Sequence, residues 1–227
     1  MFDTFFTEKK DRFNGAIVPL KVSVSEILVE DKKILAKRVI YRVQSMSMIN
    51  GGEEVRQKQE IRPLYRLPHV TSIPFVFQGV GLGIAESFLD AMIEQITPRE
   101  TMGIKLATLT TMQLNIAEVA AEVDCARLLV ERDTSGAMQA MRDGRSLTMM
   151  EKARNRRDHA YVARLCKSAV DRLHGLTAAN GLFDDNFAQR KFRDMHAVSA
   201  HISAWWDISG PTYGEVALGL EPTSPFI

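Results

Sequence analysis

Between about residues 106 and 142, apolar residues recur at intervals of three and four. This series is Leu109, Met112, Ile116, Val119, Val123, Ala126 and Val130. Such spacing forms one apolar seam along a long helix. A second apolar line falls on another face: Leu114, Ala117, Ala121, Cys125 and Leu128. Because a helix with two apolar faces must be covered on both, the pattern predicts a helix inside a bundle or between subunits.

Three more long helices are expected, at about 70–95, 147–176 and 187–206. The glycines at 79–83 keep helical periodicity and lack GxGxxG spacing after a strand, so they indicate close helix packing and not a phosphate loop. Gly144 is expected as the C′ residue that ends the helix at 106–142. The helix at 147–176 is predicted to bury Ala153, Ala160, Ala163, Val170 and Leu173. It is also predicted to turn a basic face to solvent, made of Lys152, Arg154, Arg156 and Arg157.

The first 48 residues differ from the rest, because short β-branched runs are broken there by turn residues. They predict two or three strands, which would leave sheet edges unpaired and therefore look incomplete. The polar, glycine-bearing stretch from Asn50 to Gln59 is expected to be a boundary loop. We therefore predict a partial β region at 1–48, a linker at 49–68 and a helical domain at 69–227. The fold class is mainly α: an antiparallel up-down four-helix bundle preceded by a small β region.

Composition excludes several classes of function. With 29 basic and 28 acidic residues the net charge is +1, so no overall field attracts nucleic acid or an anionic membrane. We expect no run of apolar residues that approaches the roughly 18 needed for a membrane span, and no targeting segment. Cys125 and Cys166 lie in helical segments without CxxC spacing. We expect reduced, buried thiols, a cytoplasmic protein and no structural metal.

The segment from Arg193 to Asp207 is predicted to be helical and carries a histidine where a bundle helix should be apolar. His201 falls at the edge of the apolar face, one turn from both Ala197 and Ala204, which are too small to cover an imidazole. Another helix or a ligand must fill that space. Two interpretations stay open: a core histidine hydrogen-bonded to a neighbour, or a histidine that lines a pocket.

The residues RDMHAVSAHIS (193–203), followed by WWD, PTYG and ALGL, resemble the C-terminus of two-component flavin-dependent monooxygenases built on the acyl-CoA dehydrogenase fold. The p-hydroxyphenylacetate and phenolic secosteroid hydroxylases belong to this family. IAEVAAEVDCAR (116–127) strengthens the resemblance. It implies an oxygenase component that hydroxylates a phenolic or aromatic substrate with O2 and reduced FMN, FAD being possible, delivered by a flavin reductase. His201 is the implied catalytic residue, lying over the flavin and touching the substrate.

The resemblance also implies cofactor-binding residues and partners. Arg99, taken to open the helix at 106–142, would reach a flavin phosphate across a subunit interface; otherwise it is an exposed loop arginine. Asn180 and Gly181 lie in a turn that is usually glycine-rich, although only one glycine remains here. The family's N-terminal helical domain and most of its β-domain have no counterpart, so a separate chain would have to supply them for activity.

Two alternatives to the oxygenase remain. One is a non-catalytic helical oligomerisation subunit, because two apolar faces on one helix predict self-association, as a dimer of dimers or homotetramer. The other is an acyl-CoA dehydrogenase-like oxidoreductase, which needs a carboxylate base where this chain has His201 and then Asp207. The resemblance favours the monooxygenase.

Overall fold

The computed structural model describes residues 63–227 and six short strands between residues 12 and 42. The chain divides into two units, Met1–Ile61 and Arg62–Ile227. In the first unit the strands are β1 (Arg12–Phe13), β2 (Ala16–Ile17), β3 (Lys21–Ser23), β4 (Ile27–Val29), β5 (Lys32–Ile34) and β6 (Ile40–Arg42). They pair antiparallel as β1 with β2, β3 with β6 and β4 with β5. The observed strands are therefore shorter and more numerous than the two or three predicted. The predicted boundary loop lies outside the described residues.

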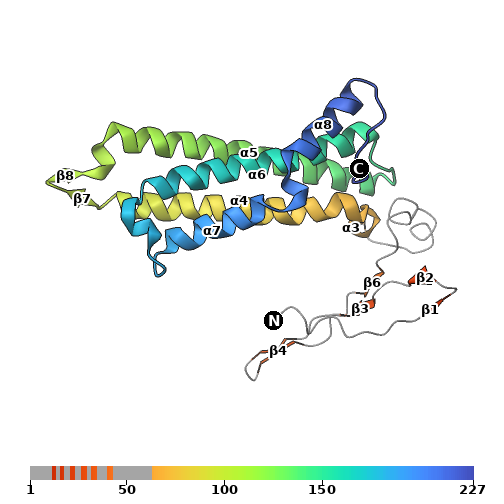
Figure 1. The fold of residues 1–227 in the computed structure, drawn as a ribbon, viewed down its shortest axis with the longest axis horizontal. Coiled ribbons are helices and arrows are strands. Elements are labelled where there is room, and N and C mark those ends of the chain that lie inside the picture. The colour runs from red at the N-terminus through yellow and green to blue at the C-terminus, as the bar shows by residue number, and fades with distance from the viewer. Residues whose placement is uncertain are drawn as a thin grey trace. The chain divides into compact units, whose positions relative to one another are not determined.

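The second unit is a helical bundle made of one short helix followed by five longer ones. They are α3 (Pro63–Arg66), α4 (His69–Ile96), α5 (Thr110–Arg142), α6 (Met149–Gly175), α7 (Phe187–Ser199) and α8 (Trp206–Ala217). Three 3-10 turns connect them: η2 (Leu106–Thr108), η3 (Ala178–Leu182) and η4 (Ile202–Ala204). A hairpin of β7 (Glu100–Thr101) and β8 (Ile104–Lys105) separates α4 from α5. Figure 1 shows α4, α5, α6 and α7 alternating in direction along one axis, which confirms the predicted up-down bundle.

Helix α6 is the centre of the bundle, since it contacts α4, α5, α7 and α8. Its start is fixed by a capping box: the Thr148 hydroxyl accepts from the Glu151 N–H at 3.2 Å, and the Glu151 carboxylate accepts from the Thr148 N–H at 2.8 Å. The main core joins the buried residues of α4, α5, α6 and α7. It comprises Leu82, Ala85, Phe88, Met92, Ile96, Val119, Val123, Ala126, Val162, Cys166, Ala169, Val170, Leu173, Ala188 and Met195.

The two apolar lines of α5 have different fates. The predicted seam packs into the core through Val119, Val123 and Ala126, which are at most 5% exposed. The second line is uncovered by the described part of this chain, with Leu114 58% and Leu128 65% exposed. Cys166 is buried as predicted, but the prediction for Cys125 is wrong because it lies on that exposed line.

Helix α4 approaches α7 closely at Gly81, where a Cβ atom would lie 3.4 Å from the Met195 methyl carbon. The prediction of small-residue helix packing is therefore confirmed at this glycine. Among the described residues, one helix, Val70–Ile96, is long and apolar enough to cross a membrane by length and composition. The prediction that no run approaches this length is wrong. A core helix passes the same test, and Phe88 and Met92 are buried in the bundle core.

Helix α5 ends as the sequence indicates. Gly144 has a positive φ of 70°, which glycine adopts without strain, and its N–H donates to the Met141 carbonyl at 3.3 Å. The chain then turns directly into α6.

Candidate functional site

The helix predicted at 187–206 is broken at the histidine of interest. Helix α7 stops at Ser199, and His201 is the extended residue that caps η4 before α8 begins. Two side-chain bonds replace helical ones: His201 Nδ1 accepts from the Ser203 N–H at 3.3 Å, and Trp205 Nε1 donates to the Ala200 carbonyl at 3.2 Å. Such local bonds compete with a continuous helix. The stripe that placed His201 between Ala197 and Ala204 is therefore wrong.

The ring of His201 is held on one face and at one nitrogen. It stacks on Phe77 of α4, with ring centroids 4.0 Å apart and planes inclined by 21°. Its Nδ1 lies 2.7 Å from the Ser203 hydroxyl oxygen. These two contacts hold the imidazole in place. Because the side chain is only half-buried, the ring is still partly accessible.

His159 of α6, which the sequence reasoning missed, joins the same hydroxyl. Its Nε2 lies 3.2 Å from the Ser203 oxygen, and the residue is 1% exposed. Burial, followed by the charge of Arg156 and by His201, lowers the pKa of His159 to about 3, so this imidazole is neutral near pH 7. Spacing could have indicated it, because His159 lies four residues before Ala163 on the inward face.

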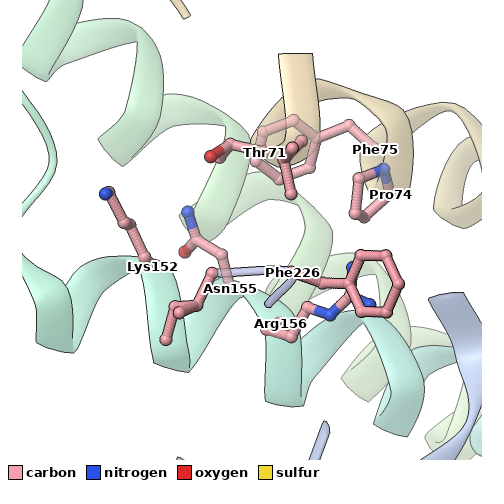
Figure 2. Close-up of a pocket in the computed structure, with 9 residues that line it drawn as sticks. Thr71, Pro74, Phe75, Lys152, Asn155, Arg156 and Phe226 are labelled. Carbon is pink, nitrogen blue, oxygen red and sulfur yellow. The ribbon is translucent and has the colours of Figure 1, made fainter. Parts of the chain in front are cut away.

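A pocket lies beside this cluster, about one turn earlier on both α4 and α6. It is lined by Val70, Thr71, Pro74 and Phe75 of α4, by Lys152, Asn155 and Arg156 of α6, and by Phe226 and Ile227. Figure 2 shows the Phe226 ring beside the Arg156 side chain, with Pro74 and Phe75 on the opposite wall. The space is about 290 Å³, including the part open to solvent. Two basic groups and one amide therefore border a largely apolar hollow.

Arg156 corrects the predicted basic outer face of α6. It is only 7% exposed, and its guanidinium carbon lies 5.4 Å from the centre of the Phe226 ring. Burial lowers the pKa of Arg156, and its Nε has no hydrogen-bond partner among the described residues. It turns inward because α6 is surrounded by other elements at this level, which a one-helix pattern does not reveal.

A buried acidic pair lies at the same end of α6. Asp133 of α5 and Asp158 of α6 are both paired with Arg132, and Asp158 is also paired with Arg157. Burial and the neighbouring charge of Asp158 raise the pKa of Asp133 from 3.8 to about 6, even though Arg132 opposes the shift. This end of the bundle therefore contains several buried ionisable groups.

The three predicted cofactor-binding residues lie far from His201 within the chain. Arg99 is in the turn after α4, separated by the β7–β8 hairpin from the helix it was expected to open. From Phe77 to the end of α4 is about 30 Å at 1.5 Å per residue. Asn180 and Gly181 are in η3, at the opposite end of α7 from His201, about 20 Å away by helix length.

The fold itself explains why residue 181 is a glycine. A Cβ atom there would overlap the Thr177 hydroxyl and lie 3.0 Å from His174 Nε2, which donates to the Gly181 carbonyl at 3.0 Å. This cradle is filled by the chain itself and does not indicate a cofactor. Arg99 is different: it is a half-buried residue in the turn after α4, and a guanidinium is a donor set that suits a phosphate.

The unit is thus an up-down helical bundle with a histidine at the break before its last helix. Solved structures share the fold: the 3-HSA hydroxylase of Rhodococcus sp. RHA1 has a TM-score of 0.75 at 20% identity, covering 86% of this chain and 52% of that one. XiaF from Streptomyces sp., in complex with FADH2 and glycerol, has a TM-score of 0.73 at 21% identity, with 85% and 50% covered.

The chain belongs to the family "Acyl-CoA dehydrogenase, C-terminal domain", whose model matches residues 75–206. Among curated relatives, the oxygenase component of the FADH(2)-dependent resorcinol hydroxylase of Rhizobium sp. (strain MTP-10005) is 32% identical over 221 residues, which is 92% of this chain and 53% of that protein. The oxygenase component of the p-hydroxyphenylacetate 3-hydroxylase of Acinetobacter baumannii is 30% identical over 153 residues, covering 64% of this chain and 35% of that protein. The chain thus spans about half or less of the length of these two relatives.

Proposed function

We propose that this chain is the C-terminal part of an oxygenase component of a two-component flavin-dependent monooxygenase, which hydroxylates a phenolic or aromatic substrate. The observation that carries the proposal is His201, held at the α7–α8 break by Phe77 and Ser203 in a domain whose curated relatives are oxygenase components. A separate chain, or a longer form of this one, supplies the N-terminal half.

His201 is the residue of this chain that contacts the substrate. A half-buried imidazole with one fixed nitrogen leaves its other nitrogen, Nε2, to bind a phenolic oxygen. It either orients the phenol or assists its deprotonation, since imidazole can donate and accept near neutral pH. Reduced flavin, when bound, would be the group that reacts with O2. The resemblance favours FMN with FAD possible, whereas the resorcinol hydroxylase and XiaF are described with FADH2, so both flavins are tested.

The decisive experiment measures product formation with a flavin reductase, the completing N-terminal half, and each reduced flavin in turn. We expect His201→Ala to lower turnover per folded molecule by about 10²-fold or more. It should also cost about 1–3 kcal/mol of stability, because the buried Ser203 hydroxyl and N–H lose their partner. His196→Ala is the matched control, because His196 of α7 pairs at 2.7 Å with Asp171 of α6 and not with Ser203 or Phe77. Equal product formation per folded molecule in wild type and His201→Ala would refute the proposal.

For the flavin, Arg99 is the proposed phosphate-binding residue, since a guanidinium gives a phosphate two parallel hydrogen bonds. Arg99→Ala should weaken flavin binding in a titration by about 1.5–3 kcal/mol. Arg193→Ala, an exposed arginine on α7, serves as the control. An unchanged titration of Arg99→Ala would make Arg99 an ordinary loop residue.

The exposed apolar line of α5 supports self-association as a dimer of dimers. Light scattering at micromolar concentration should report an oligomer, and the double change Leu114→Asp with Leu128→Asp should dissociate it, because both leucines are more than half exposed in the single chain. Leu218→Asp, 79% exposed after α8, should leave the assembly unchanged. A monodisperse wild-type monomer contradicts this assembly.

The same apolar line also favours the second candidate function, a non-catalytic oligomerisation subunit. That alternative predicts an oligomer that binds no flavin even when the N-terminal half is present. The dehydrogenase-like alternative has less support, because Asp207 is exposed in the first turn of α8 and the similar curated relatives are hydroxylase components.

A further inference from the structure

One hydroxyl group joins two histidines from different parts of the bundle. The Ser203 oxygen lies 3.2 Å from His159 Nε2 and 2.7 Å from His201 Nδ1. Ser203 is 4% exposed and His159 is 1% exposed, so water does not compete for these bonds. Of these three side chains, His201 is the one that is partly accessible to solvent.

The direction of these hydrogen bonds follows from the one donor whose role cannot change. The main-chain N–H of Ser203 can only donate, and it points to His201 Nδ1 at 3.3 Å. His201 Nδ1 must therefore be unprotonated. The proton in the 2.7 Å contact between Nδ1 and the Ser203 oxygen must then come from the hydroxyl.

The other histidine follows by the same reasoning. A hydroxyl has one proton, and Ser203 already gives it to His201. The contact with His159 therefore needs a proton on His159 Nε2. The resulting chain runs from His159 Nε2–H to the Ser203 hydroxyl and on to His201 Nδ1. Burial keeps His159 neutral, as its lowered pKa indicates, and its other nitrogen has no partner among the described residues.

We propose that Ser203, held by His159, is a positioning residue that fixes His201 in the tautomer with its proton on Nε2. The stack on Phe77 sets the plane of the ring, and the Ser203 bonds set which nitrogen carries the proton. His201 thus presents a hydrogen-bond donor. The group that faces it is an acceptor, such as a phenolic oxygen in its ionised form. This catalytic meaning rests on the proposed function, whereas the tautomer does not.

The tautomer is measured directly by nitrogen NMR of the full chain labelled with ¹⁵N-histidine, without flavin or substrate. Variants at each histidine assign the signals. In the wild type, His159 and His201 should both show a protonated Nε2 and an unprotonated Nδ1. A proton on Nδ1 of either histidine reverses the series of hydrogen bonds and overturns the proposal.

Variants at Ser203 test the cause. Ser203→Ala should lower the ratio of the two His201 tautomers by about tenfold, as loss of one hydrogen bond allows. Ser203→Thr retains the hydroxyl and should restore the ratio. Ser199→Ala is the matched control, because Ser199 bonds to the His196 carbonyl at 3.0 Å and not to His201. An unchanged ratio in folded Ser203→Ala would show that Ser203 does not set the tautomer.

The catalytic consequence is measured separately in the completed enzyme. Ser203→Ala should reduce kcat by about tenfold or more, the effect typical of losing a group that orients a functional imidazole. Ser203→Thr should recover most of it, and KM should change less than kcat. If the tautomer shifts in Ser203→Ala but turnover is absent from the wild type too, the proposed function fails and the positioning role stands. If wild-type turnover is present and the tautomer does not shift, the positioning role fails alone.

Discussion

The two halves of α6 occupy the same central place in the bundle and bury different chemistry. The half that begins at Met149 buries Asn155, Arg156, Asp158 and His159. The half that ends at Gly175 buries Cys166, Ala169, Val170 and Leu173. Because buried polar groups cost free energy unless they are paired, a helix selected only for packing would not have the first half. The difference places the apolar core at one half and the buried polar groups, including the His159 that contacts Ser203, at the other.

The neighbours of each half follow the same division. The apolar half packs against Phe88 and Met92 of α4 and the seam of α5. The polar half meets Ser203 at the helix break, Asp133 of α5 through Arg132, and Phe226 over Arg156. A site of ionisable groups is thus built on one end of a helix that the other end makes rigid.

The largest change in stability is expected when a cavity is made in the apolar half. Leu173→Ala should lower the free energy of unfolding by about 2–5 kcal/mol, because Leu173 is fully buried in the core. Chemical denaturation measures the change. Leu218→Ala, at a leucine 79% exposed after α8, should change stability by less than about 0.5 kcal/mol. A loss below 1 kcal/mol in Leu173→Ala would mean that this half does not carry the core.

A smaller loss is expected at the turn beyond the apolar half. Gly181→Ala should cost about 1–3 kcal/mol, because the new methyl group overlaps the Thr177 hydroxyl. Gly175→Ala, which meets no atom within 4 Å, should be neutral or slightly stabilising at the end of a helix. If both variants melt alike and only Gly181→Ala loses flavin, the glycine serves the cofactor instead of the fold.

The polar half should respond to pH. The pKa of Asp133 is raised from 3.8 to about 6 in the folded state. Between about pH 6 and pH 4 the Asp133 carboxyl is therefore protonated in the folded chain and ionised in the unfolded chain. Stability from this group should therefore rise, on the order of 1 kcal/mol, as pH falls from 7 to 5. Buried His159 acts in the opposite direction, because its pKa is lowered to about 3 and the unfolded imidazole gains a proton over the same range. Asp133→Asn should therefore lose about 1 kcal/mol more stability than wild type between pH 7 and 5, and Asp143→Asn, at an exposed helix end, should behave as wild type. Denaturation series at both pH values decide the outcome.

The smallest expected effect concerns the buried guanidinium. Arg156→Met should leave the free energy of unfolding within about 1 kcal/mol of wild type or raise it, because an apolar side chain of similar length removes the cost of burying a guanidinium whose Nε has no hydrogen-bond partner among the described residues. Arg156→Ala, which leaves a void beside Phe226, should be less stable than Arg156→Met. A loss above 2 kcal/mol in Arg156→Met would show that the charge has a partner in the intact protein.

Much of the fold could be predicted because it depends on periodicity. Val119, Val123 and Ala126 recur with helical spacing and are buried, and Gly144 ends α5 as its type suggests. His201 could also be singled out from residue order, because RDMHAVSAHIS (193–203) carries the family resemblance, although the helical stripe that placed it between two alanines is wrong. The break at Ala200 could not be predicted, since it depends on side-chain bonds from His201 and Trp205 that replace helical ones.

By itself, the sequence determined the helices, the seam that α5 buries and the family to which the chain belongs, since each is written in local spacing and residue order. Only the tertiary structure decided the environment of the site. It brought His159 to Ser203, 44 residues later in the chain, turned Arg156 inward and left the second face of α5 uncovered by the residues that the structure describes. The physical reason is that burial and hydrogen-bond partners depend on which elements meet, and the pattern of one helix does not contain that information.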